Sequence, residues 1–393
     1  MSERLGAIDG LRALAIALVV WFHVWQISWL PPVVHLAGRT LDFDPIPRTG
    51  FVGVDLFFFL SGFCLYLPYA ESLVDGKRLR SAADFYYRRA LKILPSYWAA
   101  IALMLALGIG GIGSLSDGVR QVALHLLFIH TWFADSYGSI NGVLWSLGVE
   151  VEFYLIFPLL RPIFDRRPLG TFGVLAALAL GYRFATSHDP STFVYRINQL
   201  PATIDLFAAG MLVAYLTRAL PAHAPRLAKR AALWTLVAIG GAALFGHAMV
   251  ACLSTANAPN WPNAWYVLGR DELLLAFAAL GLGSLFAARW WQALLANPPL
   301  RFLALVSYNV YLWHAAVAHV LLAHRIPFYG GDPHGDPHWQ VAYTVVACAA
   351  ALAVGSFFTF ALERPLLRMR PGYARLVGRS RTAGPEKLTV APS

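Results

Sequence analysis

Residues Ile8 to Leu30 form one apolar run, and it constrains the fold more than any other feature of the chain. A helix needs about 20 predominantly apolar residues to cross the hydrocarbon core of a bilayer, and this run is long enough to do so. It also contains Arg12 and His23, which eleven helical steps would place roughly 16 Å apart along the axis. Because ionisable side chains are costly in hydrocarbon, both residues are functional candidates.

The whole composition agrees with a polytopic membrane protein in a lipid bilayer. Hydrophobic residues make up 58% of the 393 residues and charged residues 13%, with a mean hydropathy of +0.57. The net charge of +10 comes from clusters between apolar segments, with no basic stripe interleaved with aromatic residues, so we expect no nucleic-acid partner. Three scattered cysteines predict neither a disulfide framework nor a thiolate metal site. Asp9 and Arg12 interrupt the first apolar run, so we expect this segment to be retained as a helix.

Ten apolar windows are long enough to span a membrane. They lie near residues 8–28, 50–70, 93–113, 143–162, 170–186, 201–217, 231–251, 271–288, 302–322 and 341–361. The segment 119–134 is shorter and polar, and if it does not span, 24 of the 31 Lys and Arg residues fall on one side. The positive-inside rule makes that side cytoplasmic. We therefore predict an all-α bundle of about ten transmembrane helices, with a re-entrant or interfacial helix near 119–134.

This threading also predicts organisation and depth. Both termini would be cytoplasmic in a bacterial-type inner membrane, with a single domain over 1–363 and a basic, disordered tail over 364–393. His23, Asp55 and Glu150 would lie in the outer half of the membrane, and Ser61 near its middle. The cations Arg12, Arg88, Arg89 and Lys92 would lie at the cytoplasmic side.

Six motifs resemble, in the same order, those of the membrane acyltransferase-3 family of O-acyltransferases. They are Ile8–Ala15 with Val19–His23, Gly53–Phe63 followed by Pro68, Arg88–Pro95, Trp145–Glu150 with Phe153, Tyr154 and Pro158, Ser307–His314, and Glu363–Pro365. The chain departs from the family at Lys92, where Arg is usual, at Val151, where Glu is common, and at Asp205, where many members carry Arg nearby. We expect no appended SGNH-type hydrolase domain, so the stand-alone membrane unit would act alone or hand its product to a separate protein.

The resemblance implies transfer of an acyl group, commonly acetyl, from cytoplasmic acyl-CoA to a hydroxyl of an extracytoplasmic acceptor. That acceptor would be a carbohydrate, a glycolipid or a macrolide-type molecule. Acyl-CoA would be a co-substrate, and we expect no bound cofactor. A transporter or flippase for a small anionic or amphipathic solute is the alternative, because buried Arg, His and Glu also mark substrate pathways.

The residues support a physical account of the transfer. Arg12, Arg88, Arg89 and Lys92 offer donors for the phosphates of CoA, although Arg88 and Arg89 also fit a positive-inside anchor. His23 would act as general base on the acceptor hydroxyl. Glu150 or Asp55 would fix its tautomer and stabilise the imidazolium. These three form the predicted catalytic set.

Other candidates have equally ordinary explanations. His314 would line the cavity or donate to the thioester carbonyl, or simply bond a neighbouring helix. Ser61 would be a nucleophile, or part of a Ser-Gly pair that allows close helix packing. Trp145 and Tyr154 would shape the cavity. The loop Asp332–His338 has ligand types that suit a divalent metal, but its Pro and Gly residues are typical of an ordinary loop, and we expect no metal.

Overall fold

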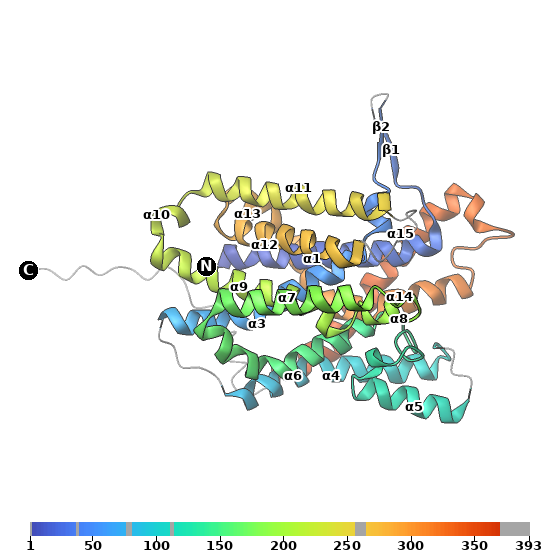
Figure 1. Cartoon of the computed structure of the whole chain (residues 1–393). Helices are drawn as coiled ribbons and strands as arrows, with labels where there is room; N and C mark the ends of the chain where they lie inside the picture. The colour runs from blue at the N-terminus through green and yellow to red at the C-terminus, as the bar shows by residue number, and fades with distance from the viewer. Residues whose placement is uncertain (1, 37–38, 76–80, 111–113, 256–264, 370–393) are drawn as a thin grey trace, which may run out of the picture.

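The structure is a computed structural model that describes residues 2–36, 39–75, 81–110, 114–255 and 265–369. Long helices lie side by side along one direction and form a bundle, with short helices and a hairpin toward its ends (Figure 1). The predicted helical membrane bundle is confirmed. The predicted disordered tail over 364–393 is wrong at its start, because residues 364–368 form a short helix; from 370 onward the tail lies outside the described residues.

Each of the ten predicted windows overlaps a long helix. These helices are α1 (Ser2–Ser28), α3 (Val52–Asp75), α4 (Ala82–Ala106), α6 (Trp145–Arg166), α7 (Pro168–Thr186), α9 (Leu200–His223), α11 (Ala231–Thr255), α12 (Arg270–Phe286), α14 (Pro298–Ala323) and α15 (Pro337–Phe358). In the described part of the chain, eight helices are long and apolar enough to cross a membrane, or nine if a pair bent by 117° counts as one span. The bent pair joins α12 to α13 (Arg289–Leu295). The remaining helix, α6, has 22 residues and carries several charges.

The ambiguous segment does not cross the bundle. Its helix α5 (Leu115–Leu126) has 12 residues, about 18 Å by helical rise, which is well short of a hydrocarbon core of about 30 Å. The short helix η1 (His130–Trp132) follows. The remaining short elements are α2 (Pro45–Arg48), α8 (Pro190–Arg196), α10 (Pro225–Ala228), η2 (Trp265–Gly269), η3 (Pro333–Gly335), η4 (Thr359–Glu363) and α16 (Arg364–Arg368).

A two-stranded hairpin departs from the all-α prediction. Strands β1 (Val33–Leu36) and β2 (Arg39–Asp42) pair antiparallel, with Val33 opposite Asp42, and project from the bundle (Figure 1). The β-branched residues and the preceding prolines favour extended backbone. Four-residue strands are too short for hydropathy windows to detect.

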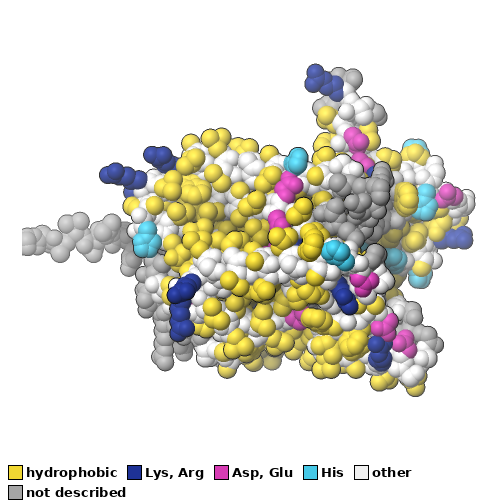
Figure 2. Space-filling model, viewed as in Figure 1, with side chains coloured by type: hydrophobic (Ala, Val, Ile, Leu, Met, Phe, Trp, Pro, Cys, Tyr) yellow, Lys and Arg dark blue, Asp and Glu magenta, His cyan; other side chains and the backbone are white. Residues whose placement is uncertain are grey.

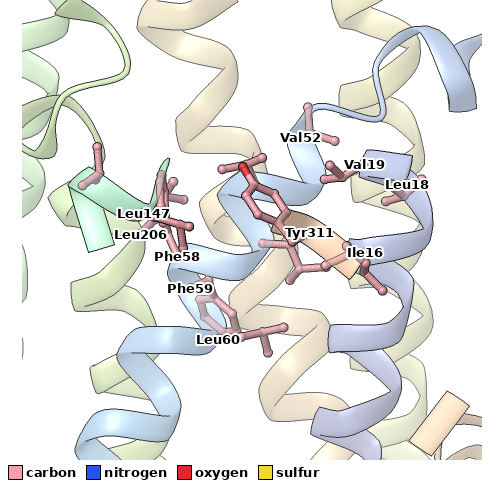
Figure 3. Packing of buried hydrophobic residues seen from close by; sticks show 14 of the residues in the cluster. Ile16, Leu18, Val19, Val52, Phe58, Phe59, Leu60, Leu147, Leu206 and Tyr311 are labelled. Atoms are coloured by element: carbon pink, nitrogen blue, oxygen red, sulfur yellow. The ribbon is translucent and has the colours of Figure 1, made fainter. Parts of the chain in front are cut away.

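Close backbone approach determines how the central helices pack. A Cβ at Gly62 would lie 2.0 Å from the carbonyl oxygen of Phe207, and a Cβ at Gly210 would lie 1.9 Å from that of Phe59. Glycine at both positions therefore lets α3 and α9 touch through their backbones. On the other side of α3, apolar side chains from α1 and α14 fill the space, including Ile16, Val19 and Tyr311 (Figure 3).

One end of the bundle, here called the basic end, is where α1, α4 and α14 begin and where α3, α6 and α15 finish. A Cβ at Gly6 of α1 would lie 2.9 Å from the guanidinium of Arg301 in α14. Lys92 of α4 pairs with Glu363 after α15. Tyr66 of α3 donates to Asp165 of α6 (2.8 Å). The direction in which each of these helices runs, toward or away from the basic end, is therefore known.

The side of the bundle is apolar. Figure 2 shows hydrophobic side chains covering most of the visible face, with Lys and Arg concentrated toward its ends. Among the exposed side chains are Val174 and Leu178 of α7, both 61% exposed, and Leu236 of α11, 66% exposed. Such a surface is stable only against lipid.

Candidate active site

A cavity of about 470 Å³ lies among α1, α3, α4, α6 and α14. Its lining residues are Asp9, Arg12, Val54, Phe57, Phe58, Leu60, Ser61, Cys64, Arg89, Lys92, Ile93, Ser146, Leu147, Glu150, Tyr154, Arg301, Ala304, Leu305, Ser307, Tyr308, Tyr311, Glu363, Arg364 and Leu367. Along α3 the lining extends from Cys64 to Val54, which is about 15 Å by helical rise. The cavity therefore runs from the basic end over about half of a hydrocarbon core of about 30 Å.

Cations dominate the wall near the basic end. Arg12, Arg89, Lys92, Arg301 and Arg364 line the cavity, against the acidic side chains Asp9, Glu150 and Glu363. This arrangement attracts an anionic ligand, and four of the five cations are arginines, whose forked donors suit phosphate.

Specific contacts hold these cations. Lys92 forms an ion pair with Glu363, which also accepts a hydrogen bond from Asn309 Nδ2 (2.7 Å). The Arg89 guanidinium lies 5.3 Å from the centre of the Tyr154 ring, and Arg12 Nη2 lies 3.4 Å from Cys64 Sγ. Arg12, Arg89 and Lys92 are thus brought together around one space, as the donor-site prediction requires.

Arg88 does not join them. Its Nε lies 2.7 Å from Asp84 Oδ2 on its own helix, and Arg88 is not among the residues that line the cavity. Successive residues of a helix point about 100° apart, so Arg89 faces the cavity and Arg88 turns away from it. The placement of Arg88 in the donor site is therefore corrected, and its anchor explanation is favoured.

Glu150 lies at the middle of the cavity, held by two hydroxyls. Ser61 Oγ donates to Glu150 Oε1 (2.9 Å), and the Tyr154 hydroxyl donates to the same oxygen. Ser61, Glu150 and Tyr154 all line the cavity. Trp145 instead stacks on Tyr137 behind the wall, with ring centres 5.8 Å apart.

The two intramembrane histidines meet one turn beyond the cavity. His314 Nε2 lies 3.1 Å from His23 Nδ1. His314 Nδ1 donates to the carbonyl of Tyr311 (2.7 Å), so in the neutral ring its Nε2 is an acceptor. His23 Nδ1 lies 2.9 Å from the Val19 carbonyl and therefore carries the proton that it donates to both partners. His23 Nε2 is left as the unprotonated nitrogen, as a general base requires.

Neither predicted carboxylate orients this ring. Glu150 bonds Ser61 and Tyr154, as described above, and Asp55 Oδ1 lies 3.3 Å from Arg270 Nε in a buried ion pair. The expected contact of His23 with Glu150 or Asp55 is therefore corrected, because His314 and a backbone carbonyl occupy its Nδ1.

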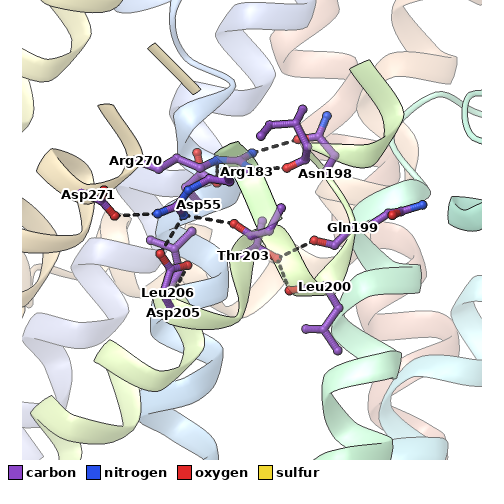
Figure 4. Close-up of polar contacts among 12 residues, drawn as sticks. Asp55, Arg183, Asn198, Gln199, Leu200, Thr203, Asp205, Leu206, Arg270 and Asp271 are labelled. Atoms are coloured by element: carbon purple, nitrogen blue, oxygen red, sulfur yellow. Dashed lines mark hydrogen bonds and ion pairs between the residues drawn. The ribbon is translucent and has the colours of Figure 1, made fainter. Parts of the chain in front are cut away.

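Asp55 belongs to a separate buried charge network among α3, α7, α9 and α12 (Figure 4). Arg183 pairs with Asp205 (2.7 Å) and Asp271 (2.6 Å). Arg270 binds Asn198 Oδ1 (2.8 Å) as well as Asp55. Arg183 and Asp205 are fully buried, so each charge depends on its partner.

Several lining residues received no role in the sequence analysis. Five of them lie inside motifs quoted for the family resemblance, which was the only sequence evidence for a role: Ser146, Tyr308, Tyr311, Glu363 and Arg364. Arg301 stood in no quoted motif, and only its position at the start of α14 brings it to the cavity.

The loop Asp332–His338 is tied by ordinary loop contacts. His334 Nδ1 lies 2.9 Å from Asp332 Oδ1, and His334 Nε2 binds the carbonyl of Ile27 (3.1 Å). Within the described ranges, no group of three or more His, Cys, Asp or Glu residues could hold a metal ion.

The sequence model of the acyltransferase-3 family, described as an acyltransferase domain, matches residues 5–359. The chain belongs to this acyltransferase family. The match covers every element that lines the cavity except the last few residues, from Glu363 to Leu367. The chain is thus an acyl-transferring enzyme embedded in a membrane.

Three relatives illustrate the range of this acyltransferase family. The chain is 29% identical over 340 residues to the exopolysaccharide production protein ExoZ of Rhizobium meliloti (strain 1021), covering 84% of this chain and 92% of the relative. It is 26% identical over 392 residues to nodulation protein 10 of Rhizobium leguminosarum bv. viciae, covering 92% and 93%. It is 25% identical over 336 residues to the peptidoglycan O-acetyltransferase OatA of Listeria monocytogenes serovar 1/2a (strain ATCC BAA-679 / EGD-e), covering 78% of this chain and 48% of the relative. No solved structure matches the chain significantly.

Proposed function

We propose that this acyltransferase moves an acyl group, most simply acetyl, from acyl-CoA at the basic end to a hydroxyl of a carbohydrate acceptor at the opposite end. One observation carries the proposal: a single cavity leads from a ring of cations to within one helical turn of a histidine pair. The family membership favours this enzyme over the transporter alternative.

The cavity fits the chemistry of CoA. Phosphates would bind Arg12, Arg89, Arg301 and Arg364 near the basic end, with Lys92 held among them by Glu363. The narrow pantetheine arm would extend along the remaining length of the cavity. Its thioester would then lie near Tyr311, next to His314 and His23.

The transfer itself follows from the free nitrogen of His23. His23 Nε2 would take the proton of the acceptor hydroxyl while its oxygen forms a bond to the thioester carbon. The carbon–sulfur bond then breaks, the acyl group leaves as an ester on the acceptor, and the CoA thiolate takes up the proton. His314 would hold the reactive tautomer of His23 through the bond at Nδ1.

The carbohydrate acceptor rests on the relatives, whose names concern exopolysaccharide production and peptidoglycan O-acetylation. A glycolipid or a macrolide-type molecule presents the same hydroxyl chemistry. We infer a bacterial-type inner membrane with the basic end cytoplasmic, because positive clusters favour that side.

Labelling would test this orientation. In a cysteine-free background, a cysteine replacing the exposed Asp336 should react with an impermeant maleimide added outside intact cells. A cysteine replacing the exposed His223, at the end of α9, should react only after permeabilisation. The reverse pattern would contradict the orientation and with it the proposed direction of transfer.

Activity would test the function. Purified protein should release free CoA from acetyl-CoA when an acceptor oligosaccharide is added, and His23→Ala should lower this rate by about 10²- to 10⁴-fold. His188→Ala is a matched control, because His188 Nδ1 also bonds the carbonyl four residues before it (2.9 Å), but the residue is exposed and does not line the cavity. Wild-type protein that consumes no acyl-CoA of any tested chain length would refute the proposal.

A further inference from the structure

Two hydroxyl groups meet in the wall of the cavity where it comes closest to the histidine pair. Ser146 Oγ and the Tyr311 hydroxyl lie 2.5 Å apart and both line the cavity. Both residues are buried, with 4% and 5% of their surfaces exposed. They come from different helices, α6 and α14, so their meeting depends on the tertiary fold.

Helix polarity shows that this is the tip of the cavity. Ser146 is the second residue of α6, which begins at the end opposite the basic end. Tyr311 is farther along α14 from the basic end than any other α14 residue in the lining. The neighbouring lining side chains Val54, Phe57 and Leu147 are apolar. Among the described lining residues, these two hydroxyls are therefore the side-chain hydrogen-bond donors at the tip.

The two hydroxyls are held in place by the segment that precedes α6. The Tyr311 hydroxyl lies 3.0 Å from the carbonyl oxygen of Val143, and Asn141 Nδ2 donates to the carbonyl of Leu312 (3.1 Å). Two contacts thus fix this segment to one turn of α14. Preorganised donors of this kind stabilise developing charge without the cost of reorganisation during the reaction.

We propose that the hydroxyls of Ser146 and Tyr311 form the oxyanion site of this enzyme. Ser146 Oγ would donate to the carbonyl oxygen of the donor thioester and stabilise its negative charge when the acceptor oxygen attacks, and the Tyr311 hydroxyl would donate to Ser146 Oγ. This inference rests on the proposed transfer from acyl-CoA and adds one catalytic residue, Ser146, and one positioning residue, Tyr311. In the free enzyme both hydroxyls lie within hydrogen-bond distance of the Val143 carbonyl, at 3.2 and 3.0 Å, and the chain from Tyr311 through Ser146 would form when the thioester oxygen binds.

The position of the base fits this assignment. His314 follows Tyr311 by three residues and donates to its carbonyl, with ring centres 5.7 Å apart. His23 bonds the Nε2 of His314. A thioester carbon at the tip would therefore lie beside Ser146 and about one helical turn from His314, to which the base His23 is bonded.

Two substitutions test the site by kinetics. Ser146→Ala should lower kcat by about 10²- to 10³-fold, the usual effect of removing one oxyanion donor, and Tyr311→Phe should lower it by less, with the KM for acetyl-CoA changed by less than about threefold in both. Ser146→Thr keeps a hydroxyl and should recover most of the rate. Tyr343→Phe is the matched control, because the buried Tyr343 hydroxyl also donates to a backbone carbonyl of α14, that of Ala318 (2.7 Å), but does not line the cavity.

A binding experiment separates a catalytic role from a structural one. S-acetonyl-CoA carries a ketone oxygen, and S-isobutyl-CoA replaces that oxygen by a methyl group. Wild-type protein should bind the ketone about tenfold more tightly, and Ser146→Ala should remove this preference while it still binds both compounds. If Tyr311→Phe does not fold, the two Ser146 variants decide the question.

Two results would overturn the assignment while leaving the proposed function intact. One is folded Ser146→Ala protein with normal kcat and normal preference for the ketone. The other is an equal loss of rate in Tyr343→Phe, which would mean that helix packing rather than charge stabilisation is measured. Wild-type protein that neither consumes acetyl-CoA nor binds either analogue would instead refute the donor itself, and the assignment with it.

Discussion

Two adjacent arginines allow a sharp test of the donor site, because only one of them lines the cavity. Arg89 faces the cavity and lies over the Tyr154 ring, whereas Arg88 pairs with Asp84 on its own helix. Both are half-buried and carry the same charge. Substituting each by Ala therefore compares two equal charge losses one residue apart.

The expected size of the effect follows from one lost phosphate contact. A hydrogen bond to a charged group contributes about 1.5–3 kcal/mol, and each 1.4 kcal/mol is a factor of ten in affinity. Because Arg89 is partly exposed, screening favours the lower end of this range. Arg89→Ala should raise the KM for acetyl-CoA about tenfold, with kcat at saturation nearly unchanged. Arg88→Ala should change the KM by less than about twofold.

The assay is CoA release by purified protein over a range of acetyl-CoA concentrations, with calorimetric binding of CoA as an independent measurement. Arg89→Lys should give an intermediate KM, because it keeps the charge and loses the fork. An equal rise in the KM for acetyl-CoA in Arg88→Ala and Arg89→Ala would show that the KM responds only to long-range charge and not to a direct phosphate contact. A larger effect of Arg88→Ala would refute the assignment of the cavity as the donor site.

Two further predictions concern stability, each measured by thermal unfolding in detergent. Gly62→Ala places a Cβ 2.0 Å from the Phe207 carbonyl oxygen and should destabilise the bundle by about 1–3 kcal/mol or more, whereas Gly240→Ala, with nothing within 4 Å, should leave it unchanged. Asp55→Ala should cost about 3 kcal/mol because Arg270 loses its carboxylate, and adding Arg270→Met should recover part of that loss. A double variant less stable than Asp55→Ala would contradict the second prediction.

The sequence predicted the helices well because the bilayer itself imposes their length and hydropathy. Each apolar window overlaps a helix, and the short segment 119–134 contains only α5 and η1. The hairpin β1–β2 was missed because its four-residue strands are set by local propensity, outside the membrane constraint. Hydropathy predicts what crosses the bilayer and says little about what lies beyond it.

Helical rise predicts how far apart two residues of one helix lie, but not the direction in which each side chain points. Arg12 lines the basic part of the cavity, and His23 bonds His314 one turn past Tyr311. Depth follows from helical rise, which is fixed for every residue. The direction in which a side chain points depends on the rotation of its helix, which packing against neighbours determines.

Asp55 shows how packing decides direction. A Cβ at Gly53 would lie 2.5 Å from the carbonyl oxygen of Ala15, so Gly53 fixes α3 closely against α1. In that rotation Val54 and Phe57 line the cavity, and Asp55 points to Arg270 on α12. The sequence alone could not reveal that the close contact at Gly53, two residues earlier, leaves Asp55 facing Arg270 instead of His23.

The same packing explains why a second histidine, rather than a carboxylate, is the partner of His23. A buried carboxylate needs a cation beside it, and the partner of Asp55 is Arg270. The Asp55 charge is therefore neutralised by this ion pair and is not available to orient His23. A neutral histidine can accept the Nδ1 proton of His23 without burying a charge. The histidine pair therefore orients the His23 ring and leaves its Nε2 free without placing a charged side chain beside it. In the proposed transfer, charge would develop only during the reaction, at the imidazole of His23 and at the thioester oxygen, and Ser146, bonded to Tyr311, would donate to that oxygen.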